Sequence, residues 1–212
     1  MKNYSLIIWD FNGTLLDDVG AALSSVNDML ARRGKPPIGL AEYREYIDVP
    51  IRGFYERVLD LENEDYDQIL SEFQSGYERH VKSCGLTQLV LPALEKARDK
   101  HIPQVVLSSS EQSQLERLLK TYGIYDFFDA VLGADDILAG SKIERAEKYM
   151  EAHGTDTASA IVIGDLLHDC DVAAAIGSEC LLLTSGHHDR ERLESAGVRV
   201  EDTLESFINE QT

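Results

Sequence analysis

The chain has 212 residues, and its 38 acidic and 20 basic side chains give a formal net charge of −18 at pH 7. This charge repels nucleic acid and anionic lipid, so we expect neither as a partner. We find no apolar run near the roughly 18 residues of a membrane span and no signal-peptide stretch before the first strand. The three cysteines are odd in number and widely spaced, which excludes a disulfide framework and favours a cytoplasmic location.

The first predicted element is a short strand, Leu6 to Trp9, whose residues are all apolar. Such a run is typical of a strand that is buried on both faces of a parallel sheet. A carboxylate, an amide and a glycine follow at once, as Asp10, Asn12 and Gly13. The carboxyl end of a buried parallel strand is where open α/β sheets bind ligands, so this segment is a candidate site.

The second region is helical and runs from about residue 19 to about residue 82. Apolar residues recur at helical spacing from Val19, from Ile51 and from Tyr66. Gly34, with the prolines that follow it, ends the first of these helices. The pattern predicts a small helical bundle inserted after the first strand, where it can cover the strand ends as a lid.

The rest of the chain alternates short apolar runs with amphipathic stretches. The predicted strands are Val105–Leu107, Ala130–Leu132, Ala160–Ile163 and Cys180–Leu183. Strand–helix alternation indicates right-handed βαβ units and therefore a parallel α/β sheet. We expect a core domain of residues 1–16 and 83–212 and a helical cap domain of residues 17–82.

Polar residues stand where several of these strands end or where the next helix begins. They are Asp10, Asn12, Ser108, Lys142, Asp165 and Asp169. Because the carboxyl ends of parallel strands share one edge, these groups should converge in one cleft. Clustered carboxylates suit Mg²⁺, and a hydroxyl with a lysine suits a phosphoryl group. The residues alone thus predict metal-assisted chemistry on a phosphate.

Four segments resemble, in order, the four motifs of the haloacid dehalogenase superfamily. They are Asp10-Phe11-Asn12-Gly13-Thr14, then Ser108, then Lys142, then Gly164-Asp165 with Asp169. The helical insert resembles the C1-type cap of the phosphoglycolate phosphatase and β-phosphoglucomutase branch. The resemblance implies a three-layer, Rossmann-like, doubly wound parallel sheet with a small inserted helical cap.

The resemblance also implies an Mg²⁺-dependent phosphatase that acts on a small phosphorylated metabolite through an aspartyl-phosphate on Asp10. The implied catalytic residues are Asp10, Asn12, Ser108 and Lys142. The implied metal ligands are Asp10, Asn12 (through its backbone carbonyl), Asp165 and Asp169. The implied substrate-binding residues are Ser108, Ser109, Lys142 and Arg52, the last from the cap. We expect a monomer or a weak homodimer.

Position 12 departs from the family, whose phosphatases usually carry an aspartate there as acid and base. An amide cannot exchange a proton at neutral pH, so Asn12 leaves alternatives open. The enzyme uses water or another group as the acid, acts on substrates with good leaving groups, or binds a phosphorylated metabolite with weak or no turnover. A phosphonate-type hydrolase with Lys35 as imine-forming residue is a further alternative.

Two expectations follow from the same reasoning. If the missing acid is the sole defect, the substitution Asn12→Asp should raise turnover strongly. The adjacent histidines His187 and His188 have no acid or cysteine partner among the predicted metal-site motifs. We therefore interpret both as loop residues and not as metal ligands.

Overall fold

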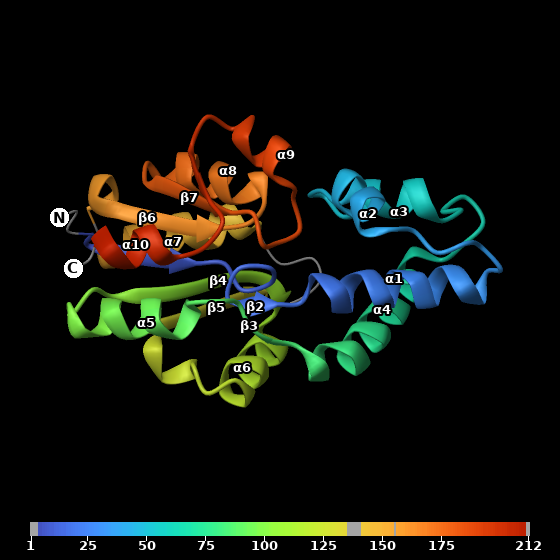
Figure 1. Cartoon of the computed structure of the whole chain (residues 1–212), viewed down its shortest axis with the longest axis horizontal. Coiled ribbons are helices and arrows are strands. Elements are labelled where there is room, and N and C mark those ends of the chain that lie inside the picture. Colours follow the sequence, from blue (N-terminus) through green and yellow to red (C-terminus); the bar gives the residue numbers. More distant parts are fainter. Residues whose placement is uncertain (1–3, 135–140, 155, 211–212) are drawn as a thin grey trace.

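The core of the protein is a parallel sheet with helices on both faces (Figure 1). The computed structural model describes residues 4–134, 141–154 and 156–210. Within these residues the sheet has six strands, all paired in parallel. In spatial order they are β5 (Ala130–Ala134), β4 (Gln104–Glu111), β1 (Leu6–Trp9), β6 (Ala160–Gly164), β7 (Glu179–Leu183) and β8 (Arg199–Glu201).

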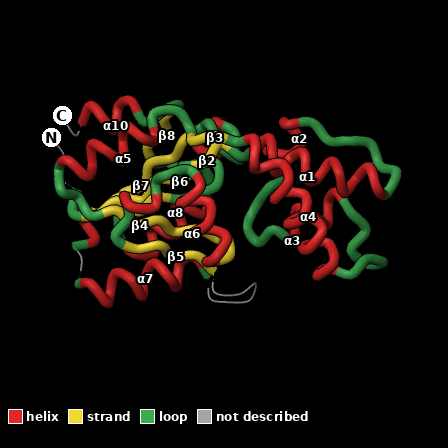
Figure 2. The backbone as a smooth tube through the Cα atoms, turned by 90° about the horizontal axis from the view of Figure 1, so that it is seen from below, coloured by secondary structure: helices red, strands yellow, loops and turns green. Residues whose placement is uncertain are grey.

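The helices form a layer on each side of the sheet. Figure 2 shows the same helices and strands from below. One face of the sheet packs against α7 and α8, and the other against α5, α6 and α10. The core helices are α5 (Val90–Asp99), α6 (Gln112–Thr121), α7 (Lys142–His153), α8 (Leu167–Ile176), α9 (Arg190–Glu194) and α10 (Glu205–Glu210). This is the predicted three-layer α/β fold. Short 3-10 turns are η1 (Val81–Ser83), η2 (Tyr125–Phe127) and η3 (Thr157–Ser159).

Strand β1 lies in the middle of the sheet, and this position accounts for its wholly apolar sequence. Ile7 and Trp9 pack into the core under α5 and α6, whereas Leu6 and Ile8 pack into the core under α7 and α8. Because side chains alternate between the faces of a strand, a strand covered on both sides must be apolar throughout. The predicted and observed bounds of this strand are the same.

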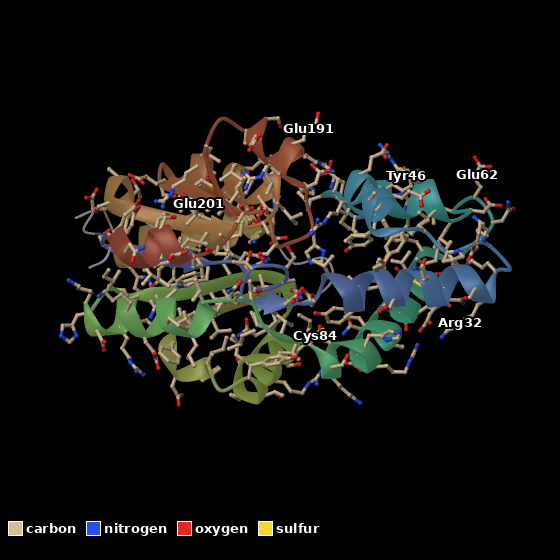
Figure 3. The ribbon with its side chains drawn as sticks, viewed as in Figure 1. Arg32, Tyr46, Glu62, Cys84, Glu191 and Glu201 are labelled. Atoms are coloured by element: carbon tan, nitrogen blue, oxygen red, sulfur yellow. The ribbon has the colours of Figure 1, made fainter. Side chains whose placement is uncertain are left out.

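The helical insert stands to one side of the sheet, at the right in Figure 1. Its helices are α1 (Val19–Arg32), α2 (Leu40–Tyr46), α3 (Arg52–Val58) and α4 (Tyr66–His80). Helix α2 was not expected from the sequence, because Tyr43 is the only buried residue among its seven and no apolar repeat marks it. Its Tyr46 and, beyond α3, Glu62 are labelled on the insert in Figure 3.

Two short strands connect the insert to the core. β2 (Leu16–Asp17) and β3 (Gly85–Leu86) pair antiparallel, so the chain leaves and re-enters the core at one place. Cys84, labelled in Figure 3, lies at this junction. The domain boundaries at residues 17 and 82 stay a prediction. None of the helices in the described part of the chain has the length and apolar character that crossing a membrane requires.

Candidate active site

The candidate nucleophile, Asp10, follows β1 directly and is buried, with 7% of its surface exposed. Lys142, the first residue of α7, donates hydrogen bonds from Nζ to Oδ1 of Asp10 and, at 2.6 Å, to Oδ1 of Asp169. The side chain of Ser141 caps this helix by accepting from the backbone N–H of Glu144. The capping bond of Ser141 fixes the start of α7 and thereby places Lys142 between the two carboxylates.

The other two acids are Asp165, in the turn after β6, and Asp169, in the first turn of α8. One carboxylate oxygen of Asp169 accepts from the backbone N–H groups of Asp165 and Leu166, at 3.0 Å each. Asp165 accepts from the hydroxyl of Thr14 at 2.8 Å and from the backbone N–H of His187 at 2.7 Å. These bonds hold both acids toward the end of β1.

Asp10, Asp165 and Asp169 form what we call the carboxylate cluster. Each offers an oxygen within 4.8 Å of the others, and all three are buried. Within the described residues, Lys142 is the one cation in salt-bridge contact with the cluster. Three acids therefore share one ammonium, and hard carboxylate oxygens with excess negative charge fit Mg²⁺. The residues that would hold the ion are thus present.

The pKa values follow from this imbalance. Burial, together with the charges of the two other acids, raises the pKa of Asp10 well above its usual range, although Lys142 opposes the shift. Burial raises the pKa of Asp165 to about 6. Burial acts the same way on Asp169, but Lys142 and the backbone N–H groups outweigh it and lower the pKa of that carboxyl. A divalent cation would favour the charged form of all three.

Strand β4 brings hydroxyls to the same place. It continues to Glu111, beyond the predicted end at Leu107, with an irregular register in its last residues. The hydroxyls of Ser108 and Ser110 lie 3.4 Å and 2.8 Å from Oδ1 of Asn12. Ser109 is exposed between them. From the sequence Ser109 was singled out beside Ser108, and Ser110 was not. Because alternate residues of a strand share a face, the alternation would have pointed to Ser110 instead.

Asn12 is also held from the other side. Its amide nitrogen donates to Oδ2 of Asp18 and to the hydroxyl of Tyr77, both at 2.7 Å. Oδ1 of Asp18 accepts from the backbone N–H of Gly13 at 2.7 Å and lies 3.5 Å from Nε2 of His187. We call these groups the Asp18 network. Burial opposes ionisation of Asp18, yet its hydrogen bonds and His187 lower the pKa of this carboxyl.

His187 lies in a loop, as predicted, but its side chain is part of the site. It is buried, and its Nδ1 lies 2.9 Å from the hydroxyl of Tyr43 on α2. Burial opposes the charged form, but Asp18 raises the pKa of His187 to about 9. A side chain at Gly13, whose φ is +75°, would place its Cβ 2.6 Å from the His187 ring, so the turn and the ring require glycine.

The cap therefore touches the site through α2. Besides the Tyr43 contact, the guanidinium of Arg44 donates to the backbone carbonyl of Gly186 at 2.8 Å. Neither tyrosine nor arginine stood out in the sequence. The only signal was that the loop 184–188 follows a strand of the sheet at its carboxyl end, where ligand-binding groups gather.

Two residues singled out from the sequence do not meet this group. Arg52 is exposed on α3, where it pairs with Glu56 at 3.0 Å and lies over the ring of Tyr66. Lys35 donates from Nζ to the backbone carbonyl of Val58 at 2.8 Å, within the cap. Neither contact involves the carboxylate cluster.

A family model described as haloacid dehalogenase-like hydrolase matches residues 7–183. Phosphoglycolate phosphatase 1 of Pseudomonas aeruginosa is 26% identical over 96% of this chain and 78% of its own length. Phosphoglycolate phosphatase of Rhodobacter capsulatus is 26% identical over 85% of this chain and 84% of its own.

Solved structures show the same fold. A haloacid dehalogenase-like hydrolase from Streptococcus pneumoniae has a TM-score of 0.86 at 19% identity, with both chains fully covered. A mutant of CbbY from Rhodobacter sphaeroides, in complex with xylulose-1,5-bisphosphate, has a TM-score of 0.76 at 18% identity. The matching regions cover 95% of this chain and 95% of that one.

Proposed function

The chain belongs to the haloacid dehalogenase-like hydrolases and is a phosphatase, and from this premise we propose that it is Mg²⁺-dependent and works through an aspartyl-phosphate on Asp10. The observation that carries the proposal is the carboxylate of Asp10, buried at the end of β1 and held by Lys142. A positioned carboxylate is a competent nucleophile toward phosphorus.

The roles of the surrounding residues follow from their positions. The ammonium of Lys142 offsets the charge that accumulates between the nucleophile and the phosphoryl oxygens. We propose that Ser108, Ser109 and Ser110, which lie beside Asn12, contact those oxygens. In the structure the hydroxyls of Ser108 and Ser110 donate to the Asn12 oxygen, and the backbone N–H of Ser110 donates to the Ser108 hydroxyl. Asp10, Asp165 and Asp169, with the Asn12 carbonyl, would hold Mg²⁺, which supplies electrostatic stabilisation of the transferring group.

We propose a small phosphorylated metabolite as substrate, because relatives over most of this chain are phosphoglycolate phosphatases. A phosphonate-type reaction through Lys35 finds no support, since its amine is engaged with Val58 in the cap. A cytoplasmic location and a monomeric or weakly dimeric state stay predictions.

Phosphate release from phosphoglycolate and from p-nitrophenyl phosphate tests the proposal. Wild type should release phosphate with Mg²⁺ and not with EDTA, and Asp10→Asn should lose activity by about 10³-fold or more. Asp17→Asn removes an exposed carboxylate from the same segment and serves as the matched control. Activity that persists in EDTA would contradict the metal dependence, and full activity in Asp10→Asn would contradict the nucleophile.

A further inference from the structure

The Asn12 amide has every hydrogen-bonding group engaged by the protein. Its nitrogen donates to Asp18 and to the hydroxyl of Tyr77, and its oxygen accepts from Ser110 at 2.8 Å and faces Ser108 at 3.4 Å. A side-chain amide has two N–H donors and one carbonyl acceptor, so these contacts leave it one orientation.

Asp18 is the group that decides this orientation. Its side chain is 1% exposed, and an ionised carboxylate can only accept hydrogen bonds. It accepts from the Asn12 amide, from the backbone N–H of Gly13 at 2.7 Å and from the hydroxyl of Tyr77 at 2.6 Å. A second carboxylate at position 12 would face Asp18 across 2.7 Å with no proton between them. This environment therefore accepts an amide and repels an acid.

We propose that Asp18 is a positioning residue of the phosphatase site, which turns the Asn12 amide so that its oxygen orients the hydroxyls of Ser108 and Ser110. This inference rests on the proposed function. It makes Asn12 part of a complementary pair in which the carboxylate stands at position 18, one hydrogen bond away from position 12.

The Asp18 network also connects the cap to the loop after β1, which carries Asp10 and Asn12. Asp18 lies between the linker strand β2 and helix α1, and Tyr77 lies in the last turn of α4. Both meet at Asn12, two residues after Asp10. A cap that moves away would take the Tyr77 hydroxyl with it and leave the amide with one donor contact fewer. The Tyr77 contact thus adds support from the cap to the orientation that Asp18 sets.

The proposal reverses the expectation for Asn12→Asp. Instead of raising turnover, this substitution should lower both stability and kcat, because it places two buried carboxylates in contact. Exchanging both residues (Asn12→Asp with Asp18→Asn) restores the pairing in the opposite sense. The amide then at position 18 could donate to the side chain at position 12 and accept from Gly13, while Tyr77 and Ser110 donate to the carboxylate at position 12.

Thermal unfolding in EDTA of the two single variants and of the double exchange tests the pairing. Each single substitution should lower the midpoint by roughly 5 °C or more, and the double exchange should recover at least half of the summed loss. Additive losses would overturn the proposal. Tyr77→Phe should also lower the midpoint more than Tyr122→Phe, a control that removes a hydroxyl donating to the Val81 carbonyl near the same junction.

Kinetics with p-nitrophenyl phosphate and Mg²⁺ separate positioning from a merely structural role. Asp18→Asn should lower kcat by roughly tenfold with little change in KM, and the double exchange should recover kcat relative to Asn12→Asp. Unchanged kcat in a folded Asp18→Asn would overturn the proposal. If wild type releases no phosphate, the proposed function fails, and the unfolding experiment still supports or overturns the pairing.

Discussion

The carboxylate cluster and the Asp18 network both contain buried carboxylates, but the negative charge is compensated differently in the two. In the carboxylate cluster, three acids share the ammonium of Lys142, and the pKa values of Asp10 and Asp165 are raised. In the Asp18 network, a single acid faces four donors, and its pKa is lowered.

The difference distinguishes a cluster that is suited to bind a cation from a network that fixes the positions of its own neighbours. Buried charge is costly unless it is paired, so the excess negative charge of the carboxylate cluster lowers the free energy of unfolding. A bound cation would remove that cost. Asp18 needs no ligand, since hydrogen-bond donors surround it, and it can therefore keep neighbouring groups in place. The carboxylate cluster therefore fits a cation, and the Asp18 network fixes the positions of its neighbours.

The largest effect should come from removing the one cation of the cluster. Lys142→Met leaves Asp10 and Asp169 without their ion pair, and in the metal-free protein it should lower the free energy of unfolding by about 3–5 kcal/mol. Urea unfolding in EDTA measures this. Lys148→Met, an exposed lysine of the same helix, should stay within about 0.5 kcal/mol of wild type. Equal effects of the two substitutions would mean that the cluster is not short of positive charge.

A smaller effect of opposite sign should follow from removing an acid of the cluster. Asp10 has Lys142 as its side-chain hydrogen-bond partner, and its charged form is disfavoured by burial and by the other two acids. Asp10→Asn should therefore keep or raise the free energy of unfolding in EDTA, by up to about 1–2 kcal/mol, while activity is lost. Asp18→Asn should lower it. If both substitutions destabilise equally, the contrast between the two groups of acids is wrong.

The sequence predicted the parts that follow from chain topology. Strand β1 was found with its observed bounds, and the parallel sheet follows from strand–helix alternation. Because parallel strands end at one edge, the convergence of Asp10 and Asp165 follows as well, even though they lie 155 positions apart in the sequence. These inferences need only the order of the elements, not the packing of particular side chains.

The Asp18 network could not be predicted in this way. Its members come from the loop after β1, from the linker after β2, from cap helix α4 and from the loop after β7. Tyr77 and His187 reach Asp18 only because the cap is docked in one orientation. Asp18 stands at the N-cap position of α1, yet its side chain makes no capping bond and contacts Gly13 and Asn12 instead. His187 was predicted as a loop residue, and its burial against Tyr43 could not be foreseen from the sequence.

The smallest predicted effect is on the contact between cap and core at His188. Its Nδ1 accepts from the backbone N–H of Leu167 at 3.2 Å, and its Nε2 donates to the carbonyl of Ile47 in the cap at 3.1 Å. These contacts require the neutral ring. Burial, with the charge of Arg192 nearby, lowers the pKa of His188 to about 4, although the charges of Asp48 and Asp169 oppose the shift.

Between pH 6.5 and pH 4 His188 therefore binds a proton in the unfolded chain but not in the folded chain. This residue thus lowers the free energy of unfolding as the pH falls. The raised pKa values of Asp10 and Asp165 act in the opposite sense over the same range. A comparison with His188→Asn, which keeps an acceptor for Leu167, isolates the histidine. Across this window, wild type should lose about 1 kcal/mol of unfolding free energy relative to the variant. Parallel pH profiles of the two proteins would show that the ring takes up its proton without breaking the contact to the cap.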